Sequence, residues 1–557
     1  MVEPDERTIP DIVEQAANLF GSAQALVDGD IDWSFNELYI HVREMAQALI
    51  SHGVEHGERV GIWAPNTWEW VIAALGVHQI GGVLVPINTR FKGKEASYVL
   101  KRANVKRLFT VTDFLDTNYV NLLHDAQDLG ALNQIIVMRG QPQKGTTSMA
   151  EFLNSSDSTD ETTYQERRNR VSGNDLCHIM FTSGTTGLPK GAMLTHSAVT
   201  RGYNDWADIV GLQTGDRYLI VNPFFHSFGL NAGILACLMK GACMLPHPVF
   251  DVAEVMDRVP IDRISMLPGP PAIYQTILNH PDLENFDMST LRLAVTGAAV
   301  IPVEMIVQMR EKLGFETVVT GYGLTEGSGL ATMCRHDDDP ETIAKTSGRA
   351  MPGMEVKIVN EQNEEVSIGD PGEIIVRGYN VMKGYLDDPE QTAQAINDEG
   401  WLHTGDVGEI TERGSLIITD RKKDIIVTSG GKNVSPSEIE NKIKASPFIK
   451  DALVVGDRRK FLSCLVAIEF ETVSNWALRK KIPFTTYRDL TEKPEVRDLV
   501  SKEIIRANEE TSSLQVRKFE LIPKELDHED GELTATQKIK RNVIIEQFSE
   551  LVESMYK

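Results

Sequence analysis

A run of eleven residues at positions 181–191, FTSGTTGLPKG, constrains the fold of this chain more than any other stretch. It follows the apolar segment 176–180, which predicts a short buried strand. Glycines let backbone N–H groups turn toward an anion, hydroxyl side chains add donors, and Lys190 adds a positive charge. The run therefore predicts a polyphosphate-binding loop at the end of a strand. A solvated turn of the same composition is the alternative.

The spacing of this run is G-x-x-G-x-x-K, whereas the usual P-loop requires G-x-x-x-x-G-K-[ST]. The run instead resembles the phosphate-binding signature of the adenylate-forming superfamily, which includes acyl-CoA synthetases, firefly-type luciferases and the adenylation domains of peptide synthetases. The resemblance implies that the run holds the β- and γ-phosphates of ATP. The residues to which it assigns this contact are Thr182, Ser183, Gly184, Thr185, Thr186, Gly187 and Lys190.

Length and charge limit the kinds of partner. With 557 residues, 41% of them hydrophobic, the chain is long enough for a few domains with sizeable cores. Its net charge of −24 argues against nucleic acid and against constitutive binding to anionic lipid. The segment 1–10 is rich in charged residues and lacks an apolar core. The most apolar region, 228–246, is interrupted by Asn231 and Lys240. Neither a signal peptide nor an integral membrane segment is therefore expected.

The five cysteines include no C-x-x-C pair and show no metal-ligand spacing. Free thiols in a reducing compartment are the preferred interpretation. A soluble cytoplasmic protein is the expectation. The oligomeric state stays open, with a homodimer as the assembly considered.

Strands alternate with helices in the first part of the chain. Residues 59–63 and 83–87 predict strands, and residues 68–77 between them predict a helix. This alternation is typical of a layered α/β domain. Short apolar runs within 348–376, around a Gly-Asp-Pro-Gly turn, predict a small β-rich subdomain.

Two stretches near the phosphate-binding run are less distinctive. Residues 141–172 are polar, with only scattered apolar residues, and predict a surface connection. Residues 192–207 predict a helix.

A strand that begins at residue 416 ends in five consecutive charged residues, 420–424. A core would not tolerate that run, so we place a domain boundary here, although a solvated charge run is the alternative. The predicted domains are residues 1–421 and 422–557. The predicted fold class is α/β. A large N-terminal domain of layered α/β sheets, with the small β-rich subdomain, precedes a small mobile α+β C-terminal domain.

The segment 318–326 carries a second strong motif. Tyr322 can stack on a purine base, Thr325 can donate to a phosphate, and Glu326 can bind a hard cation. The segment resembles the adenine and magnesium motif of the same superfamily. A strand at 293–296 also leads into a turn of small residues that the resemblance packs on the adenine. The glycine and alanine positions so assigned are Gly297, Ala298, Ala299, Gly321 and Gly323.

His226 follows a predicted strand in the sequence Pro-Phe-Phe-His. That order places it near the carboxyl edge of a sheet, where α/β proteins usually bind ligands. A structural histidine is the alternative. The resemblance implies that His226 lines the carboxylate pocket and shapes the approach of coenzyme A.

Asp406 ends the sequence Trp-Leu-His-Thr-Gly-Asp, where a carboxylate on a turn can accept hydrogen bonds from a ribose. An Asx turn is the alternative. The W-x-x-T-G-D resemblance implies that Asp406 is the ribose ligand. It further implies that Arg421 contacts the nucleotide and that Lys423 is the hinge of the small domain.

Two segments of the predicted second domain complete the site that the resemblance implies. The glycine-rich turn with Gly430 and Gly431 lines the pantetheine tunnel during thioester formation. The segment 531–541 carries the catalytic lysine, which we assign to Lys538, with Lys540 as the less favoured register. Gln537 stands where the superfamily usually has glycine, and it matches the variant found in long-chain acyl-CoA synthetases.

The resemblance extends from about residue 8 to residue 557 and implies an enzyme. A carboxylate attacks the α-phosphate of ATP, pyrophosphate leaves, and the thiol of coenzyme A then attacks the acyl-adenylate. ATP, Mg²⁺ on Glu326 and coenzyme A are the implied cofactors and co-substrates. Two other functions stay open: loading of a carrier protein, and non-catalytic nucleotide binding.

The acid is less constrained than the reaction. Residues 88–93 and 108–114 resemble bacterial ligases for propanoate side chains of degraded steroid rings, whereas 454–457 resembles long-chain fatty acid synthetases. Small residues along the expected pocket predict room for a bulky or extended apolar acid. These small residues are Gly229, Ala232, Gly233, Gly297, Gly327 and Gly329.

Overall fold

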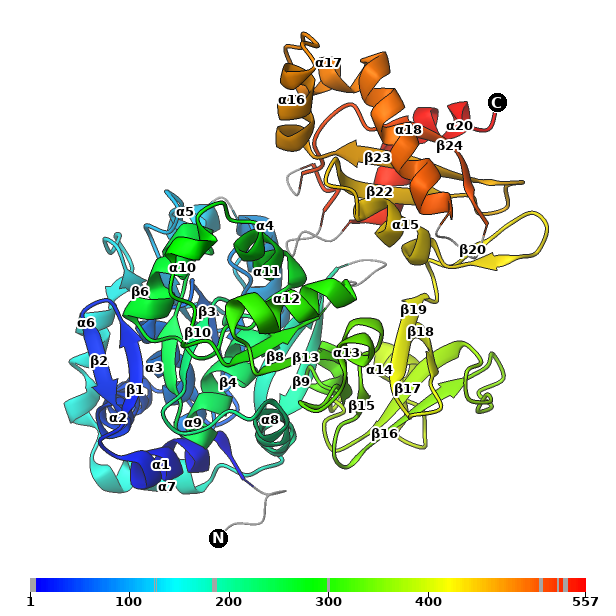
Figure 1. Cartoon of the computed structure of the whole chain (residues 1–557). Coiled ribbons are helices and arrows are strands. Elements are labelled where there is room, and N and C mark those ends of the chain that lie inside the picture. Colours follow the sequence, from blue (N-terminus) through cyan, green and yellow to red (C-terminus); the bar gives the residue numbers. More distant parts are fainter. Residues whose placement is uncertain are drawn as a thin grey trace. The chain divides into compact units, whose positions relative to one another are not determined.

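The computed structural model describes residues 7–124, 126, 128–182, 188–297, 301–509, 514–527, 530–533 and 539–557. The chain divides into two compact units (Figure 1). Unit 1 comprises Met1–Lys357, Ile375–Thr404 and Ile410–Ile417, and unit 2 comprises Ile358–Ile374, Gly405–Glu409 and Ile418–Lys557. The mixed α/β class expected from the sequence is confirmed, whereas the boundary between residues 421 and 422 stays a prediction.

The largest sheet of unit 1 has seven strands in the order β7-β6-β5-β3-β4-β8-β9. All neighbours in it are parallel except β8 and β9. Parallel strands need crossover connections, and helices provide them between successive strands except between β6 and β7, which are joined without a helix. The strands are β3 (Arg59–Trp63), β4 (Val83–Pro86), β5 (Arg107–Val111), β6 (Gln134–Arg139), β7 (Thr147–Ser148), β8 (Leu176–Thr182) and β9 (Lys190–Thr195).

Two further four-stranded sheets of unit 1 have the orders β10-β11-β1-β2 and β12-β13-β14-β15. Met266 joins them, because it forms parallel bridges to Tyr218 of β10 and to Leu293 of β12. The strands are β1 (Gln24–Asp28), β2 (Ile31–Ser34), β10 (Arg217–Ile220), β11 (Cys243–Pro246), β12 (Leu293–Thr296), β13 (Thr317–Tyr322), β14 (Thr332–Met333) and β15 (Arg349–Ala350).

Side-chain caps fix where several helices of unit 1 begin. Ser34 and Glu37 form a reciprocal capping box at the start of α2, and Thr67 caps α3. The helices are α1 (Ile9–Phe20), α2 (Phe35–Ser51), α3 (Trp68–Gln79), α4 (Gly93–Arg102), α5 (Tyr119–His124), α6 (Met149–Leu153), η1 (Ser156–Ser158), α7 (Glu161–Asn169), α8 (His196–Val210), η2 (Phe228–Leu235), α9 (Ala236–Lys240), α10 (Val252–Ile261), α11 (Pro271–Leu278), η3 (Leu283–Asn285), α12 (Val303–Leu313), η4 (Thr325–Gly327), α13 (Pro340–Lys345) and α14 (Pro389–Ala395).

Strands β8 and β9 flank the phosphate-binding run and pair with each other antiparallel, with Thr182 opposite Lys190. The predicted buried strand before the run is therefore confirmed. The predicted helix at 192–207 is wrong in its first part, because Ala192 pairs with Met180 and the strand continues to Thr195. Helix α8 begins only at His196, where the Thr195 hydroxyl accepts a hydrogen bond from Ala198 N–H.

A fourth sheet, of order β16-β17-β18-β19, contributes residues to both units. It confirms the short strands predicted around residues 348–376. Its strands are β16 (Met354–Val359), β17 (Gly372–Gly378), β18 (Leu402–Ile410) and β19 (Leu416–Arg421).

Unit 2 contains a three-stranded sheet, β22-β23-β24, whose two faces bury separate cores. Helices α15 and α18 lie against one face of this sheet (Figure 1). Helices α19 and α20 cover the other face, where the alternate residues of the same strands point. A short hairpin, β20-β21, precedes it. The elements are β20 (Ile426–Val427), β21 (Asn433–Val434), α15 (Pro436–Lys444), β22 (Ile449–Val455), β23 (Leu462–Ile468), α16 (Phe470–Arg479), α17 (Tyr487–Thr491), α18 (Pro494–Glu509), β24 (Val516–Leu521), α19 (Arg541–Gln547) and α20 (Ser549–Ser554).

All five cysteines are reduced and buried. Four lie in unit 1, and Cys464 lies in the core of unit 2. Burial raises the pKa of each thiol, to about 12 for Cys243. Separately, no helix in the described ranges combines the length and apolar character that crossing a bilayer requires.

Three histidines meet in the interior of unit 1. The ring of His78 lies 5.0 Å from that of His178 and 5.8 Å from that of His196, measured between centroids. All three side chains are fully buried. Burial lowers the pKa of His178 to about 4 and that of His196 to about 3, and it lowers the pKa of His78 well below its usual value. The three rings are therefore neutral in the native protein near pH 7.

We expect the histidine cluster to make unit 1 sensitive to mild acid. Below pH 6.5 these rings take up protons in the unfolded chain but not in the native one, so stability is lost as the pH falls from 6.5 toward 4. Each histidine contributes a slope of about 1.4 kcal/mol per pH unit in that window. Urea denaturation at pH 7.5 and 5.5 measures the effect. His78→Leu should remove one of the three histidine contributions, so that the slope of the unfolding free energy with pH falls by about 1.4 kcal/mol per pH unit. An unchanged slope would contradict this interpretation.

Candidate active site

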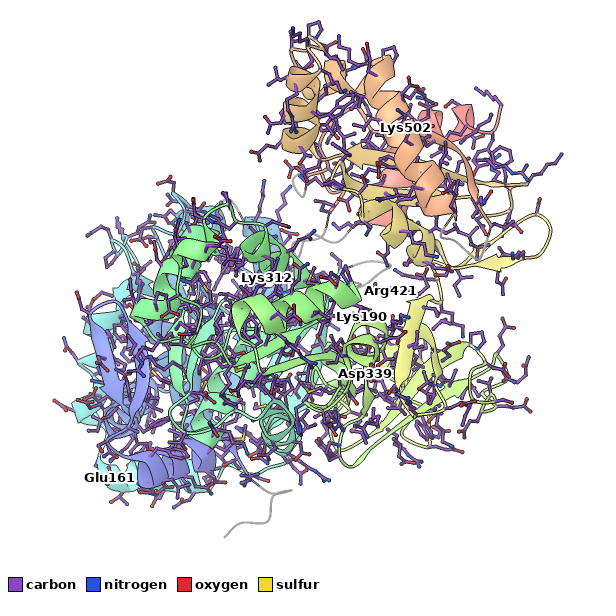
Figure 2. All side chains as sticks on the ribbon, viewed as in Figure 1. Glu161, Lys190, Lys312, Asp339, Arg421 and Lys502 are labelled. Carbon is purple, nitrogen blue, oxygen red and sulfur yellow. The ribbon has the colours of Figure 1, made fainter. Side chains whose placement is uncertain are left out.

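In unit 1, one tyrosine that the sequence motifs do not include contacts both Glu326 and Lys190. Tyr385 donates its hydroxyl to Glu326 Oε1 at 2.8 Å, and its ring centroid lies 5.0 Å from Lys190 Nζ. The Thr182 hydroxyl reaches the same Glu326 oxygen at 3.4 Å. Lys190, which is labelled in Figure 2, also donates a hydrogen bond from Nζ to Gln391 Oε1. All five side chains are half-buried.

Backbone hydrogen bonds hold the segment that carries Tyr385. Met382 N–H donates to Glu326 O at 2.8 Å, which ties the segment to η4. Lys383 N–H donates to Met193 O at 2.9 Å, and residues Ala192 and Tyr385 form an antiparallel bridge. The segment therefore pairs with β9, which begins with Lys190. Because Tyr385 and Glu326 are 59 residues apart, no local spacing in the sequence links them.

Burial and the Glu326 carboxylate both raise the pKa of Tyr385. The phenol therefore stays protonated and remains a donor to Glu326 at neutral pH. Gly384-Tyr385 precedes the Asp-Pro start of α14, but this local sequence gives no indication of which side chains the tyrosine contacts.

The predicted adenine segments meet at the ends of two neighbouring parallel strands. β12 pairs with β13, and the pairing ends at Thr296 and Thr320, directly before Gly297 and Gly321. A Cβ added at Gly297 would lie 3.3 Å from Gly321 O, so the two backbones approach closely there. Tyr322 is the last residue of β13. At Gly323, a Cβ would lie 2.1 Å from a backbone carbonyl oxygen, which excludes any side chain.

His226 lies in an exposed turn between β10 and the π-helix η2, and Phe228 N–H donates to its Nδ1 at 3.1 Å. The neighbouring Ser227 is close to the loop that follows η4. A Cβ at Gly329 would lie 2.7 Å from the Ser227 hydroxyl oxygen. The fold thus brings the His226 turn beside the Thr325–Gly327 turn that carries Glu326.

Several small residues of the expected acid pocket are packed against protein atoms. A Cβ at Gly229 would lie 2.2 Å from Pro223 O, and one at Gly329 would lie 2.5 Å from the Tyr203 hydroxyl oxygen. At Gly233 the distance to a neighbouring isoleucine side chain would be 3.0 Å. The expectation that these residues leave room for a bulky acid is wrong for these three glycines, because protein already occupies that space.

The candidate residues of unit 2 form their own group. Arg421, the last residue of β19 (Figure 2), has its Nε 3.8 Å from Asp406 Oδ1. Asp406 lies within strand β18, which runs from Leu402 to Ile410, and not on a turn, which corrects the sequence prediction. Lys423 is the second residue after the end of β19, and Gly430 and Gly431 form the exposed end of the β20-β21 hairpin.

Eight of the predicted site residues lie outside the described residues. They are Ser183, Gly184, Thr185, Thr186, Gly187, Ala298, Ala299 and Lys538.

The described residues nearest to Lys538 in the sequence, Leu533 and Ile539, are well anchored. Leu533 and Ile539 form an antiparallel bridge, and Lys540 N–H donates to Glu532 O at 2.8 Å. The Glu532 side chain is fully buried, and it lies 2.9 Å from Lys524 Nζ.

The donor set around Glu326 fits a magnesium ion that is shared with a nucleotide. In the described part of the chain, both hydrogen bonds to the carboxylate end on Oε1, which leaves Oε2 for another ligand. No cluster of three or more His, Cys, Asp or Glu side chains suited to a metal occurs among the described residues. Mg²⁺ is commonly held by one or two carboxylates together with substrate phosphates, which requires no such cluster.

Comparisons with known proteins identify the family of this chain. The family model described as AMP-binding enzyme matches residues 13–386, and the one described as AMP-binding enzyme C-terminal domain matches residues 423–557. A 3-[(3aS,4S,7aS)-7a-methyl-1,5-dioxo-octahydro-1H-inden-4-yl]propanoyl:CoA ligase from Rhodococcus jostii is 45% identical, over 81% of this chain and 86% of that protein. The mitochondrial medium-chain acyl-CoA ligase ACSF2 from Homo sapiens is 32% identical, over 81% of this chain and 77% of that protein.

Solved structures share the fold. The anthranilate CoA ligase AuaEII in complex with anthranoyl-AMP aligns with a TM-score of 0.82 and 22% identity over 99% of both chains. The O-succinylbenzoate coenzyme A synthetase MenE from Bacillus subtilis, in complex with AMP, aligns with a TM-score of 0.74 and 23% identity, over 96% of this chain and 98% of that one.

A fold of this kind, with a nucleotide signature on a β-hairpin, defines an adenylate-forming enzyme. The chain belongs to the AMP-binding enzyme family. It is an AMP-forming acyl-CoA ligase, which uses ATP to join a carboxylic acid to coenzyme A.

Proposed function

We propose that the two units supply different groups to the two half-reactions of this ligase. In unit 1, Thr182, Lys190 and the intervening run bind the β- and γ-phosphates of ATP, and Thr325 donates to a phosphate. The contact of Thr182 and Lys190 with the Glu326–Tyr385 pair supports this assignment. The adenine packs on Tyr322 and on the strand ends at Gly297, Ala298, Ala299, Gly321 and Gly323.

Glu326 is the proposed ligand of Mg²⁺, through the oxygen that Tyr385 and Thr182 leave open. When bound, the ion neutralises charge on the phosphates. The side chains of the chain do the rest: Lys190 stabilises the charge that develops as pyrophosphate leaves, and preorganised donors of this kind are each worth a few kcal/mol. His226 lines the acid site and shapes the approach of the coenzyme A sulfur.

In unit 2, Asp406 binds the ribose hydroxyls and Arg421 contacts the nucleotide. Their 3.8 Å separation supports a shared ligand. Lys538 contacts the α-phosphate and the substrate carboxylate while the adenylate forms. Gly430 and Gly431 serve the thioester step. A hinge at Lys423 lets the mobile domain at 422–557 change between one arrangement for adenylate formation and another for thioester formation, which is a common form of switching.

The acid is proposed to be a propanoate carried on a fused bicyclic ring. The observation that favours it is the 45% identity to the Rhodococcus jostii ligase, against 32% to the medium-chain ligase of Homo sapiens. A medium- or long-chain fatty acid is the second candidate. The free, buried cysteines support a reducing, cytoplasmic location. The homodimer stays a prediction that light scattering would check.

A panel of acids tests this proposal. ATP–pyrophosphate exchange, followed by mass detection of the coenzyme A ester, should show kcat/KM for the bicyclic propanoate at least about tenfold above octanoate, palmitate or acetate. Octanoate or palmitate as the best substrate would overturn the choice of acid but not the reaction. Exchange with an acid, but without a coenzyme A ester, would point to a carrier protein as the acceptor.

A further inference from the structure

Tyr385 lies between two side chains of opposite charge that the reaction needs apart. Its ring faces Lys190 Nζ at 5.0 Å from the centroid, and its hydroxyl donates to Glu326 Oε1 at 2.8 Å. Within the described residues, Lys190 and Glu326 form no direct ion pair. The ammonium instead has two other partners, the tyrosine ring and the carbonyl oxygen of the Gln391 side chain.

The tyrosine is itself held from two sides. Its backbone bridges to Ala192 of β9, two residues after Lys190. Its N–H donates to the Thr392 hydroxyl of α14 at 2.9 Å. The same helix supplies Gln391, so one strand and one helix fix the ring, the amide and the ammonium together. These groups line a cavity of about 470 Å³ with Tyr98 and Arg102 among its other walls.

A direct ion pair between Lys190 and Glu326 would have to be broken before the ammonium could bind phosphate and the carboxylate could bind the metal. We propose that Tyr385 is a positioning residue that keeps these two side chains separate and aimed for the magnesium complex of ATP. This inference rests on the roles proposed above for Lys190 and Glu326. The ring supplies a cation–π partner that phosphate oxygens can replace, and the hydroxyl fixes the carboxylate so that Oε2 remains open.

The two parts of Tyr385 can be removed separately, and ATP binding can be followed by calorimetry without acid or coenzyme A, so that no turnover occurs. Tyr385→Phe keeps the ring and removes the donor. The Mg²⁺ concentration for half-maximal ATP binding should rise about tenfold or more, because loss of a group that orients a metal ligand usually has such an effect. Binding of ATP without Mg²⁺ should change by less than about twofold, since the cation–π contact remains.

Tyr385→Leu removes the ring as well, so that Lys190 can pair with Glu326. ATP binding without Mg²⁺ should then weaken about fivefold, which is the scale of a half-exposed ion pair that must be broken. Adding Glu326→Gln to Tyr385→Leu should restore Mg²⁺-free binding, because no carboxylate remains to capture the ammonium. A tyrosine with a purely structural role would give no such rescue.

Tyr119→Phe is the matched control. Its hydroxyl donates to Thr89 O at 2.7 Å elsewhere in unit 1, and its loss should leave both ATP measurements unchanged. If Lys190→Ala and Glu326→Gln weaken binding while both Tyr385 variants bind as the unmodified protein does, the inference is wrong and the proposed site stands. If Lys190→Ala and Glu326→Gln also bind normally, the site itself is wrong. Failure of the double variant to recover overturns the separation of charges.

Discussion

Replacing Lys538 with alanine should slow ATP–pyrophosphate exchange by about 10²–10³-fold, because one preorganised donor to developing charge is lost. The same variant should convert a supplied acyl-adenylate to the coenzyme A ester at a rate within a few fold of the unmodified enzyme. The reason is that Lys538 is proposed to act on the α-phosphate only in the first half-reaction. Radiolabelled pyrophosphate exchange and a single-turnover thioester assay measure the two steps.

Lys540→Ala is the matched control for this prediction. Lys540 lies two residues further on, directly before α19, and its backbone N–H already bonds to Glu532 O at 2.8 Å. Because the catalytic role is assigned to Lys538, the side chain of Lys540 should be dispensable for both steps. The opposite pattern would assign the catalytic role to Lys540, and loss of both steps in Lys538→Ala would refute the division of labour between the half-reactions.

The ion pair between Arg541 and the buried Glu440 should have the largest effect on stability. Arg541 Nη2 donates to both carboxylate oxygens of Glu440, at 2.8 and 2.9 Å, and Nη1 donates to Val454 O at 2.9 Å. These bonds join α19 to α15 and β22. Arg541→Met leaves the Glu440 carboxylate buried without its partner, and removal of one member of such a pair usually costs about 3–5 kcal/mol. Hydrogen exchange of the β22 and β23 amides in the full chain reports this loss for unit 2 alone.

An exposed pair of the same chemistry serves as the comparison. Arg497 makes two hydrogen bonds to Glu520, at 2.8 and 3.0 Å, but their side chains are 48% and 28% exposed. Arg497→Met should therefore cost no more than about 1 kcal/mol. Adding Glu440→Gln to Arg541→Met should recover part of the loss, because the uncompensated charge is gone. Equal losses for Arg541→Met and Arg497→Met would show that burial does not control the effect.

Elements that carry a strong local pattern could be predicted from the sequence. The capping box of Ser34 and Glu37 fixes the start of α2, and the apolar segment before the phosphate-binding run forms β8 as expected. Such elements are predictable because the groups that determine them lie within a few residues of each other.

Elements that depend on distant partners could not be predicted. The stretch 141–172, expected as a surface connection, contains α6 and α7 because Phe152 and Tyr164 are buried, the latter with its hydroxyl bonded to Gln79. Strand β9 extends into the predicted helix because β8 pairs with it. In these cases tertiary contacts override the local pattern.

The candidate site shows the same division. Motifs with known chemistry predicted Thr182, Lys190 and Glu326 as site residues, but the spacing of residues gave no means of finding Tyr385, which contacts Glu326 across 59 positions. The expected room was also wrong beside Gly229, Gly233 and Gly329, because a missing side chain leaves a cavity only if nothing else fills it. At Gly229 a backbone carbonyl fills that space.

The burial of all five thiols has a consequence for the fate of the intermediate. An acyl-adenylate acylates any thiolate that it meets, and the thiolate is the reactive form of cysteine. Because each cysteine is buried with a raised pKa, none offers a competing nucleophile at neutral pH. The protein is thereby protected from self-acylation at sulfur and from mixed disulfides with its own co-substrate, so that no cysteine of the chain competes with the thiol of coenzyme A.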